Sequence, residues 1–124
     1  MIAGRRSYTM ASMSPGEKGL ALVGGKFGER WKKLLEAYDL PHDTISVEWG
    51  KVCDPGLIEQ ALQRDPAITT VFATHSETST GALFDIEAIA KITRARGRRL
   101  VLDAITSLGV HRLPQDQWGV DVVV

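Results

Sequence analysis

The chain has 124 residues, enough for one domain or for part of a larger one. Its 44% hydrophobic and 24% charged residues are ordinary for a soluble globular protein. Fifteen basic and fifteen acidic residues cancel, so the sequence carries no electrostatic signal for nucleic acid, and no apolar run approaches the ~20 residues that span a bilayer. We therefore expect neither a nucleic-acid partner nor a membrane partner.

The N-terminal segment 1–13 has two arginines, no acidic residue and several hydroxyls, a composition faintly like an organelle transit peptide. We favour a non-native or disordered start over a targeting signal, and place the folded part of the chain at 14–124. The single cysteine, Cys53, cannot form an internal disulfide. This favours a reducing compartment, and we expect the cytoplasm.

Short apolar runs mark the predicted strands, which fall at 19–24, 44–49, 68–73, 98–103 and 120–124. Helical spacing marks the segments between them. The first helix has one apolar face, made of Phe27, Trp31, Leu34, Leu35 and Tyr38. Asp54 and Asp85 are the expected N-caps of two further helices, and Gly97 is the expected stop of the third. The buried face of the second helix is expected to contain Leu57, Ile58, Ala61 and Leu62.

The alternation of strands and helices predicts an α/β fold of three layers, with a mostly parallel sheet and right-handed crossovers. Ligands of such sheets bind at the carboxyl ends of the strands. Three segments are expected there: "GGKFGER" (24–30), "THSETSTG" (74–81) and "DAITS" (103–107). We therefore look for a site among these segments.

Asp103 is the first candidate, because a carboxylate at the end of an apolar strand needs a partner. It could hold Mg²⁺, accept a phosphoryl group, or pair with a protonated heterocyclic nitrogen. It could also only cap or brace its own loop. The Mg²⁺ interpretation lacks a phosphate-binding loop, and the phosphoacceptor interpretation lacks acidic neighbours at the end of the first strand.

The two other segments also allow a plain structural interpretation. The hydroxyls of 74–81 could bind a polar ligand or only form a self-capped turn. Phe27 could be a core residue or a ring stacked on a flat ligand, with the adjacent glycines allowing close approach. Ser79, His75 and Asp103 do not make a convincing hydrolase triad, because the sequence has no nucleophile elbow. The cysteine and the histidines lack metal-ligand spacing.

Together the stretches "GGKFGERW", "THSETSTG", "LVLDAITSLG" and "WGVDVVV" resemble the class V pyridoxal-phosphate aminotransferases, in particular the serine–pyruvate and alanine–glyoxylate group. The resemblance covers Ser14 to Val124. It implies that Asp103 pairs with the pyridinium nitrogen of pyridoxal 5'-phosphate and that Phe27 stacks on the ring. It further implies that Thr78 hydrogen-bonds the ring's phenolic oxygen and that Ile105 packs on the opposite ring face. His75 matches a loop histidine without an assigned role.

The resemblance also implies a Schiff-base lysine just beyond Val124, which none of the six lysines in this chain matches. The family's phosphate-cradling loop has no counterpart in 1–13. We therefore expect 14–124 to be a partial cofactor-binding large domain, with no catalytic residue of its own, weak or absent cofactor binding and no activity as a fragment.

The implied parent is a homodimeric aminotransferase that moves an amino group between a small amino acid, serine or alanine, and a 2-oxo acid, pyruvate or glyoxylate. One alternative is a non-catalytic α/β binding or interaction module. Another is a different class V branch, a phosphoserine aminotransferase or a cysteine desulfurase. The 74–81 loop disfavours the desulfurases, which usually have asparagines there.

Overall fold

A computed structural model describes residues 13–124 of the chain. Five strands form one parallel sheet in the order β2-β1-β3-β6-β7. These strands are β1 Lys18–Val23, β2 His42–Ser46, β3 Ile68–Thr74, β6 Arg99–Asp103 and β7 Val122–Val123. The helices are α2 Lys26–Ala37, α3 Pro55–Arg64, α4 Ile86–Ala95 and α5 Gln115–Trp118. A small antiparallel hairpin, β4 Ser76–Glu77 with β5 Ala82–Leu83, follows β3.

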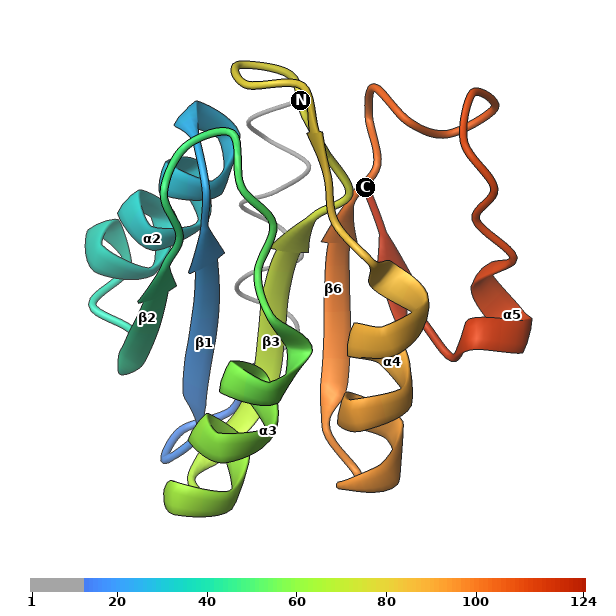
Figure 1. Ribbon diagram of the computed structural model, residues 1–124. Coiled ribbons are helices and arrows are strands. Elements are labelled where there is room, and N and C mark those ends of the chain that lie inside the picture. Colours follow the sequence, from blue (N-terminus) through green and yellow to red (C-terminus); the bar gives the residue numbers. More distant parts are fainter. Residues whose placement is uncertain (1–12) are drawn as a thin grey trace.

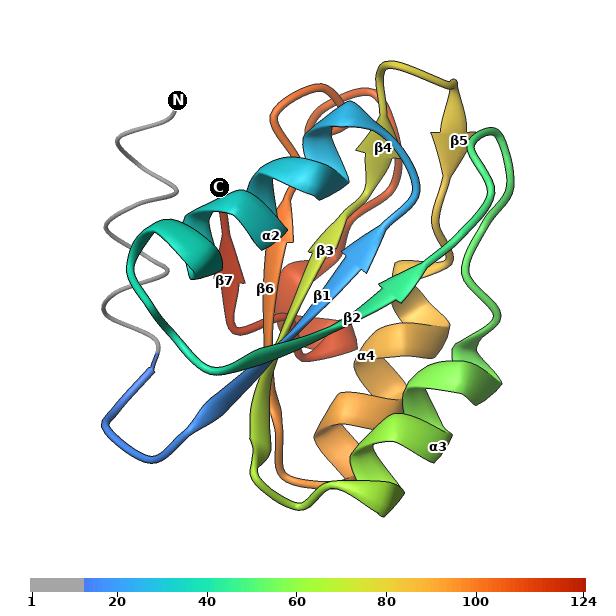
Figure 2. The ribbon, with the colours of Figure 1, turned by 90° about the vertical axis from the view of Figure 1, so that its left-hand side faces the viewer.

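The fold has the three layers that the alternating pattern predicts. Helix α2 covers one face of the sheet, and α3 and α4 cover the other, as Figure 2 shows. All strands of the main sheet run in the same direction, so their carboxyl ends meet at one edge (Figure 1). The β4–β5 hairpin lies at that edge, which is where an open α/β sheet places its ligand site.

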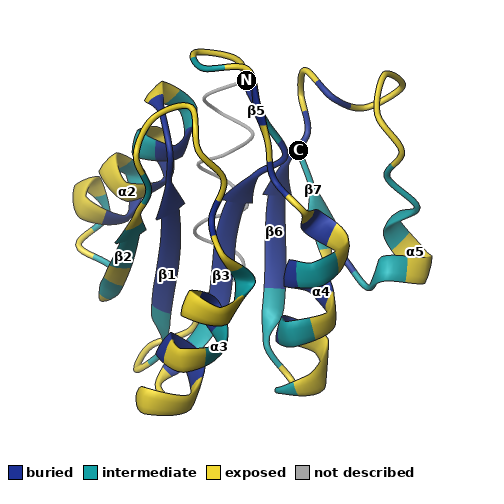
Figure 3. Ribbon diagram, in the orientation of Figure 1, coloured by how far each residue is buried: buried dark blue, intermediate teal, exposed yellow. Residues whose placement is uncertain are grey.

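The central strands are buried on both faces (Figure 3). Successive side chains alternate between two apolar clusters, so that Leu20 and Leu22 join the α3–α4 cluster while Ala21 and Val23 join the α2 cluster. Trp31 of α2 is fully buried, and its indole N–H donates to the carbonyl of Ala73 over 3.1 Å. Burying such a side chain contributes roughly 1.5–3 kcal/mol, so α2 is firmly attached to the sheet.

Both expected N-caps are confirmed. The carboxylate of Asp54 accepts from the N–H of Gly56 over 2.9 Å, and that of Asp85 accepts from the N–H of Ala88 over 3.0 Å. Gly97 follows the end of α4 at a φ of 65°. A left-handed residue at this point suits glycine, which has no Cβ to clash with the carbonyl.

Several details differ from the sequence-based expectations. The last strand is Val122–Val123 rather than 120–124, because β6 pairs with it only through Val101 and Leu102. The second strand runs from His42 to Ser46 rather than over 44–49, because its neighbour β1 ends at Val23 and offers no partner strand beyond that point. Leu57 is 44% exposed, at the margin of the α3 face rather than within it. The segment 74–81 contains the first strand of a hairpin, too short for periodicity to reveal.

Residues 1–12 lie outside the described part of the chain, and the expected non-native or disordered start falls almost entirely within them. Within residues 13–124, no helix combines the length and the apolar character that crossing a membrane requires.

Candidate functional site

The structure brings the three predicted segments together at the carboxyl edge of the sheet. The N–H of His75 donates to the carbonyl of Asp103 over 2.9 Å, which joins the end of β3 to the end of β6. The hydroxyls of Thr78 and Thr106 are 3.1 Å apart. The N–H of Lys26 donates to the Ser79 hydroxyl over 3.0 Å, so the start of α2 joins the same group.

Asp103 is the last residue of β6 and is only 4% exposed. It lies opposite Thr74 in the ladder between β3 and β6. One carboxylate oxygen accepts from the N–H of Ile105 over 3.1 Å, so the loop-bracing interpretation holds for that oxygen. A carboxylate this deeply buried is a strong hydrogen-bond acceptor and a strong partner for a cation.

The edge holds a second buried polar group, the Thr74 hydroxyl. It is enclosed and has no hydrogen-bond partner among the described residues. Leaving a buried hydroxyl unmatched costs about 1–3 kcal/mol. The carboxyl ends of β3 and β6 therefore form a polar and desolvated edge, in contrast to the apolar middle of the same strands.

The other predicted residues lie on the three segments that meet at this edge. Ile105 is 37% exposed, so its aliphatic side chain is free to cover one face of a flat ligand. Thr78 is exposed on the loop of the β4–β5 hairpin. Phe27 is half-buried at the start of α2, with the guanidinium carbon of Arg30 lying 4.7 Å from the ring centroid. Its ring is thus neither fully in the core nor fully in solvent.

Glu77 is the residue that the sequence reasoning missed. It is 1% exposed, yet it lies in a loop of hydroxyl residues where an acidic side chain suggests solvent. Its carboxylate accepts from the N–H of Gly28 over 2.8 Å and from the Ser79 hydroxyl over 2.9 Å. One feature of the sequence could have indicated it: Gly25, the N-cap of α2, has no side chain, so the first N–H groups of this helix need an acceptor from elsewhere in the chain.

The glycines before and within α2 serve the packing of the chain itself. A Cβ at Gly25 would lie 2.5 Å from two carbons of Glu77, and one at Gly28 would lie 2.9 Å from the carbonyl oxygen of Leu22. A Cβ at Gly24 would lie 2.9 Å from the Phe84 ring. These glycines therefore allow close approach of protein to protein, and their close approach to a ligand stays a prediction.

His75 is buried beneath this edge, where it makes a structural hydrogen bond and takes no part in a Ser-His-Asp triad. Its Nδ1 is 2.9 Å from the hydroxyl of Ser107, while the hydroxyl of Ser79 donates to Glu77. Burial, followed by the charge of His111, lowers the pKa of His75. The neutral ring thus ties the loop after β3 to the loop after β6, and the triad rejected from the sequence is not formed.

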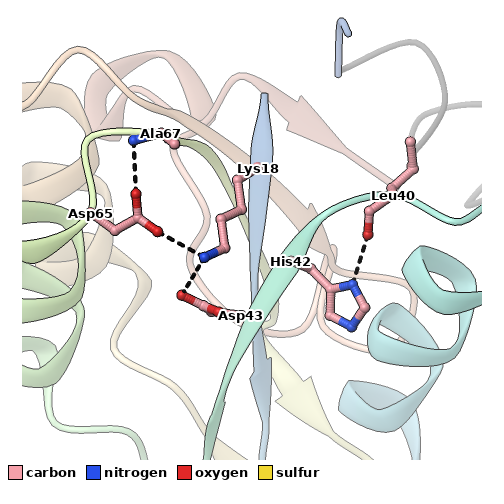
Figure 4. Close-up of polar contacts among 6 residues, drawn as sticks. All are labelled: Lys18, Leu40, His42, Asp43, Asp65 and Ala67. Carbon is pink, nitrogen blue, oxygen red and sulfur yellow. Dashed lines mark hydrogen bonds and ion pairs between the residues drawn. The ribbon is translucent and has the colours of Figure 1, made fainter. Parts of the chain in front are cut away.

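The lysines at the two ends of the sheet are in different surroundings. Lys18 begins β1 at the opposite edge, where its ammonium lies 2.7 Å from Asp65 and 3.0 Å from Asp43 (Figure 4). Lys26 is exposed at the start of α2, on the site's edge. No group of three or more His, Cys, Asp or Glu that could hold a metal ion occurs within residues 13–124.

The sequence matches the family described as "Aminotransferase class-V" over residues 28–124. The chain belongs to the class-V aminotransferase family. Its lineage is therefore enzymatic, and this family implies pyridoxal phosphate as the cofactor and an amino acid and a keto acid as substrates. The buried carboxylate of Asp103, with the exposed side chains of Ile105 and Thr78 on the loops at the same edge of the sheet, fits that cofactor.

Relatives of several kinds are similar to this class-V chain. It is 44% identical over 114 residues to the soluble hydrogenase 42 kDa subunit of Anabaena cylindrica, covering 90% of this chain and 30% of the relative. It is 40% identical over 92 residues to 2-aminoethylphosphonate–pyruvate transaminase of Pseudomonas aeruginosa, covering 74% and 25%. The crystal structure of alanine–glyoxylate aminotransferase from Nostoc sp. superposes with a TM-score of 0.90 at 32% identity, covering 98% and 32%.

The structural match confirms the predicted fold as that of the class-V aminotransferases. A cysteine desulfurase of Escherichia coli also superposes, with a TM-score of 0.73 at 13% identity, a likeness of fold alone. The chain spans about 30% of the length of curated relatives that it matches. What those whole proteins do is therefore carried to this chain only as a proposal.

Proposed function

We propose that this chain is the part of a pyridoxal-phosphate aminotransferase that holds the ring of the cofactor. Its parent would move an amino group between serine or alanine and a 2-oxo acid such as pyruvate or glyoxylate. The observation that carries the proposal is the buried carboxylate of Asp103 at the carboxyl end of β6, with Thr78 and Ile105 exposed beside it.

Each residue has a role that its chemistry supports. Asp103 would hold a proton on the pyridine nitrogen, because a desolvated carboxylate strongly favours a charged partner. Thr78 would hydrogen-bond the phenolic oxygen of the ring. Phe27 and Ile105 would cover its two faces and exclude water from them. The bound cofactor supplies the electron sink for the loss of the substrate's α-proton.

Residues 14–124 would form a partial cofactor-binding large domain, assembled as a homodimer in the parent enzyme. We further propose that residues 1–124 alone bind the cofactor weakly and do not transaminate. The described lysines support this, since Lys18 is paired at the far edge and Lys26 belongs to the aromatic motif. Cys53, a buried free thiol, is in keeping with a cytoplasmic location.

The cofactor site is tested by titrating the chain with pyridoxamine 5'-phosphate, which needs no lysine for attachment, and following ligand fluorescence. Saturable binding that Asp103→Asn removes, and that Asp116→Asn on exposed α5 leaves intact, is the expected result. Equal binding by Asp103→Asn would overturn the proposed role of this carboxylate. Absence of binding in all three forms would favour a non-catalytic α/β module.

The activity of the chain is tested separately, by incubating it with pyridoxal phosphate, alanine or serine, and glyoxylate. We expect no conversion of glyoxylate to glycine above the rate with cofactor alone. Turnover by these 124 residues would overturn the proposed inactivity, and would direct attention to Lys26 as the amine nearest the site along the chain.

A further inference from the structure

Glu77 lies where segment 74–81 meets the start of α2. Its carboxylate accepts from the N–H of Gly28 over 2.8 Å and from the hydroxyl of Ser79 over 2.9 Å. Longer contacts of 3.4 Å run to it from the N–H groups of Phe27 and Ser79. All these partners are N–H or O–H donors, so the buried carboxylate is matched by hydrogen bonds from two segments of the chain.

The start of α2 depends on these contacts. The first N–H groups of a helix have no partner within the helix, and Gly25, the N-cap, has no side chain to supply one. Ser79 accepts from Lys26, and Glu77 accepts from Phe27 and Gly28. The hairpin loop thus caps a helix that begins about fifty residues earlier in the chain, and its negative charge complements the helix dipole.

Close packing holds the arrangement in one geometry. Gly25 leaves no room for a Cβ beside Glu77, whose nearest two carbons would lie only 2.5 Å away. A Cβ at Gly28 would lie 2.9 Å from the carbonyl oxygen of Leu22 in β1, so the helix start packs closely on that strand. The helix start is therefore held between β1 and the Glu77 side chain, and a shift of either would move Phe27 relative to Thr78, the residue that follows Glu77.

We propose that Glu77 is a positioning residue of the cofactor site. It fixes the backbone that carries the ring-stacking Phe27 to the backbone that carries Thr78, so that both residues reach one bound ring in a single geometry. This inference rests on the proposed function, since it assigns Glu77 a role toward the ligand of that site. Glu77 itself is enclosed by protein and does not touch the ring.

The test replaces Glu77 with glutamine, which keeps the shape of the side chain but turns one acceptor oxygen into a donor amide. Glu87→Gln is the matched control, because Glu87 is an exposed helix residue whose carboxylate lies 3.9 Å from the ammonium of Lys91. Ser79→Ala is a milder second variant that removes one donor to Glu77. Affinity for pyridoxamine 5'-phosphate and amide hydrogen exchange at Gly28 and Val71 are measured in each.

We expect Glu77→Gln to weaken binding about tenfold and to accelerate exchange at Gly28 by a similar factor, with Val71 in the core of β3 unchanged. Ser79→Ala should give smaller changes of the same kind, and Glu87→Gln none. Unchanged affinity of Glu77→Gln would overturn the inference. So would equal acceleration at Val71 and Gly28, which would show a general loss of stability.

Failure of the proposed function gives a different result. If the unmodified chain does not bind pyridoxamine 5'-phosphate, the cofactor site itself is wrong, and with it the role of Glu77 toward a ligand. If the unmodified chain binds and Glu77→Gln binds equally well, only the positioning role is wrong.

Discussion

Replacing Gly28 with alanine has two opposing effects on stability, both within the first turn of α2. Alanine is better than glycine in a helix interior by about 1 kcal/mol. The new Cβ, however, would lie 2.9 Å from the carbonyl oxygen of Leu22 and 3.1 Å from the Cα of Val23, both in the backbone of β1. A backbone cannot turn aside as a side chain does, and overpacking of this kind costs about 1–3 kcal/mol. Because both close contacts are to backbone atoms, we take the upper half of that range, about 2–3 kcal/mol. Subtracting the helix gain leaves an expected net loss of about 1–2 kcal/mol in the free energy of unfolding.

Urea unfolding followed by the fluorescence of buried Trp31 measures this loss. Gly56→Ala is the matched control, because Gly56 lies in the first turn of α3 and its Cβ would meet only the exposed Asp54 side chain, at 3.3 Å. That control should be as stable as the unmodified chain or slightly more stable. If Gly28→Ala also proved neutral or stabilising, the close contact of α2 with β1 would not limit this position, and the packing argument would be wrong.

Three further predictions concern titratable groups. Burial raises the pKa of the Cys53 thiol to about 11, so at pH 8 a disulfide reagent should label it only as fast as the chain unfolds; rapid labelling without urea would contradict its burial. Burial lowers the pKa of His75 below its usual 6.5, which makes the unfolded chain the stronger proton binder. The free energy of unfolding should therefore fall as the pH drops below 6.5. His75→Gln should flatten this part of the curve of urea midpoint against pH, and an unchanged slope would show that His75 does not cause the pH dependence. The hydrogen bond from Lys18 lowers the pKa of Asp65, so Lys18→Met should destabilise the chain at neutral pH. That deficit should shrink as the pH falls below 3.8, the ordinary value for Asp65, and a deficit independent of pH would point to lost packing instead.

The sequence was sufficient for the elements that bury an apolar face. The strands β1, β3 and β6 are short apolar runs buried on both sides, and their alternation with amphipathic helices requires a layered parallel sheet. The caps Asp54 and Asp85 were equally clear, because a short polar side chain before a periodic apolar stretch has a local cause and a local effect.

The sequence was insufficient where the deciding contact lies elsewhere in the chain. The end of β2 is set by the end of β1, and Leu57 is exposed although it shares the helical spacing of buried Ile58, Ala61 and Leu62. Glu77 resembles a solvated loop residue until the start of α2 is placed beside it. The candidate residues Asp103, Thr78 and Ile105 could be proposed from the resemblance, but the hydrogen bonds of Glu77 to the start of α2 could not.

The hydrogen bonds that join the three loops have a consequence for how the chain folds. They connect Gly28 with Glu77, 49 residues apart, and His75 with Ser107, 32 residues apart. Ordering a long loop is entropically costly before the contacts that reward it exist, and folding slows as contacts become less local. The loops can meet only after β1, β3 and β6 are in register. The edge that carries Asp103 should therefore be among the last parts of the molecule to become ordered during folding, and among the first to be lost by local opening.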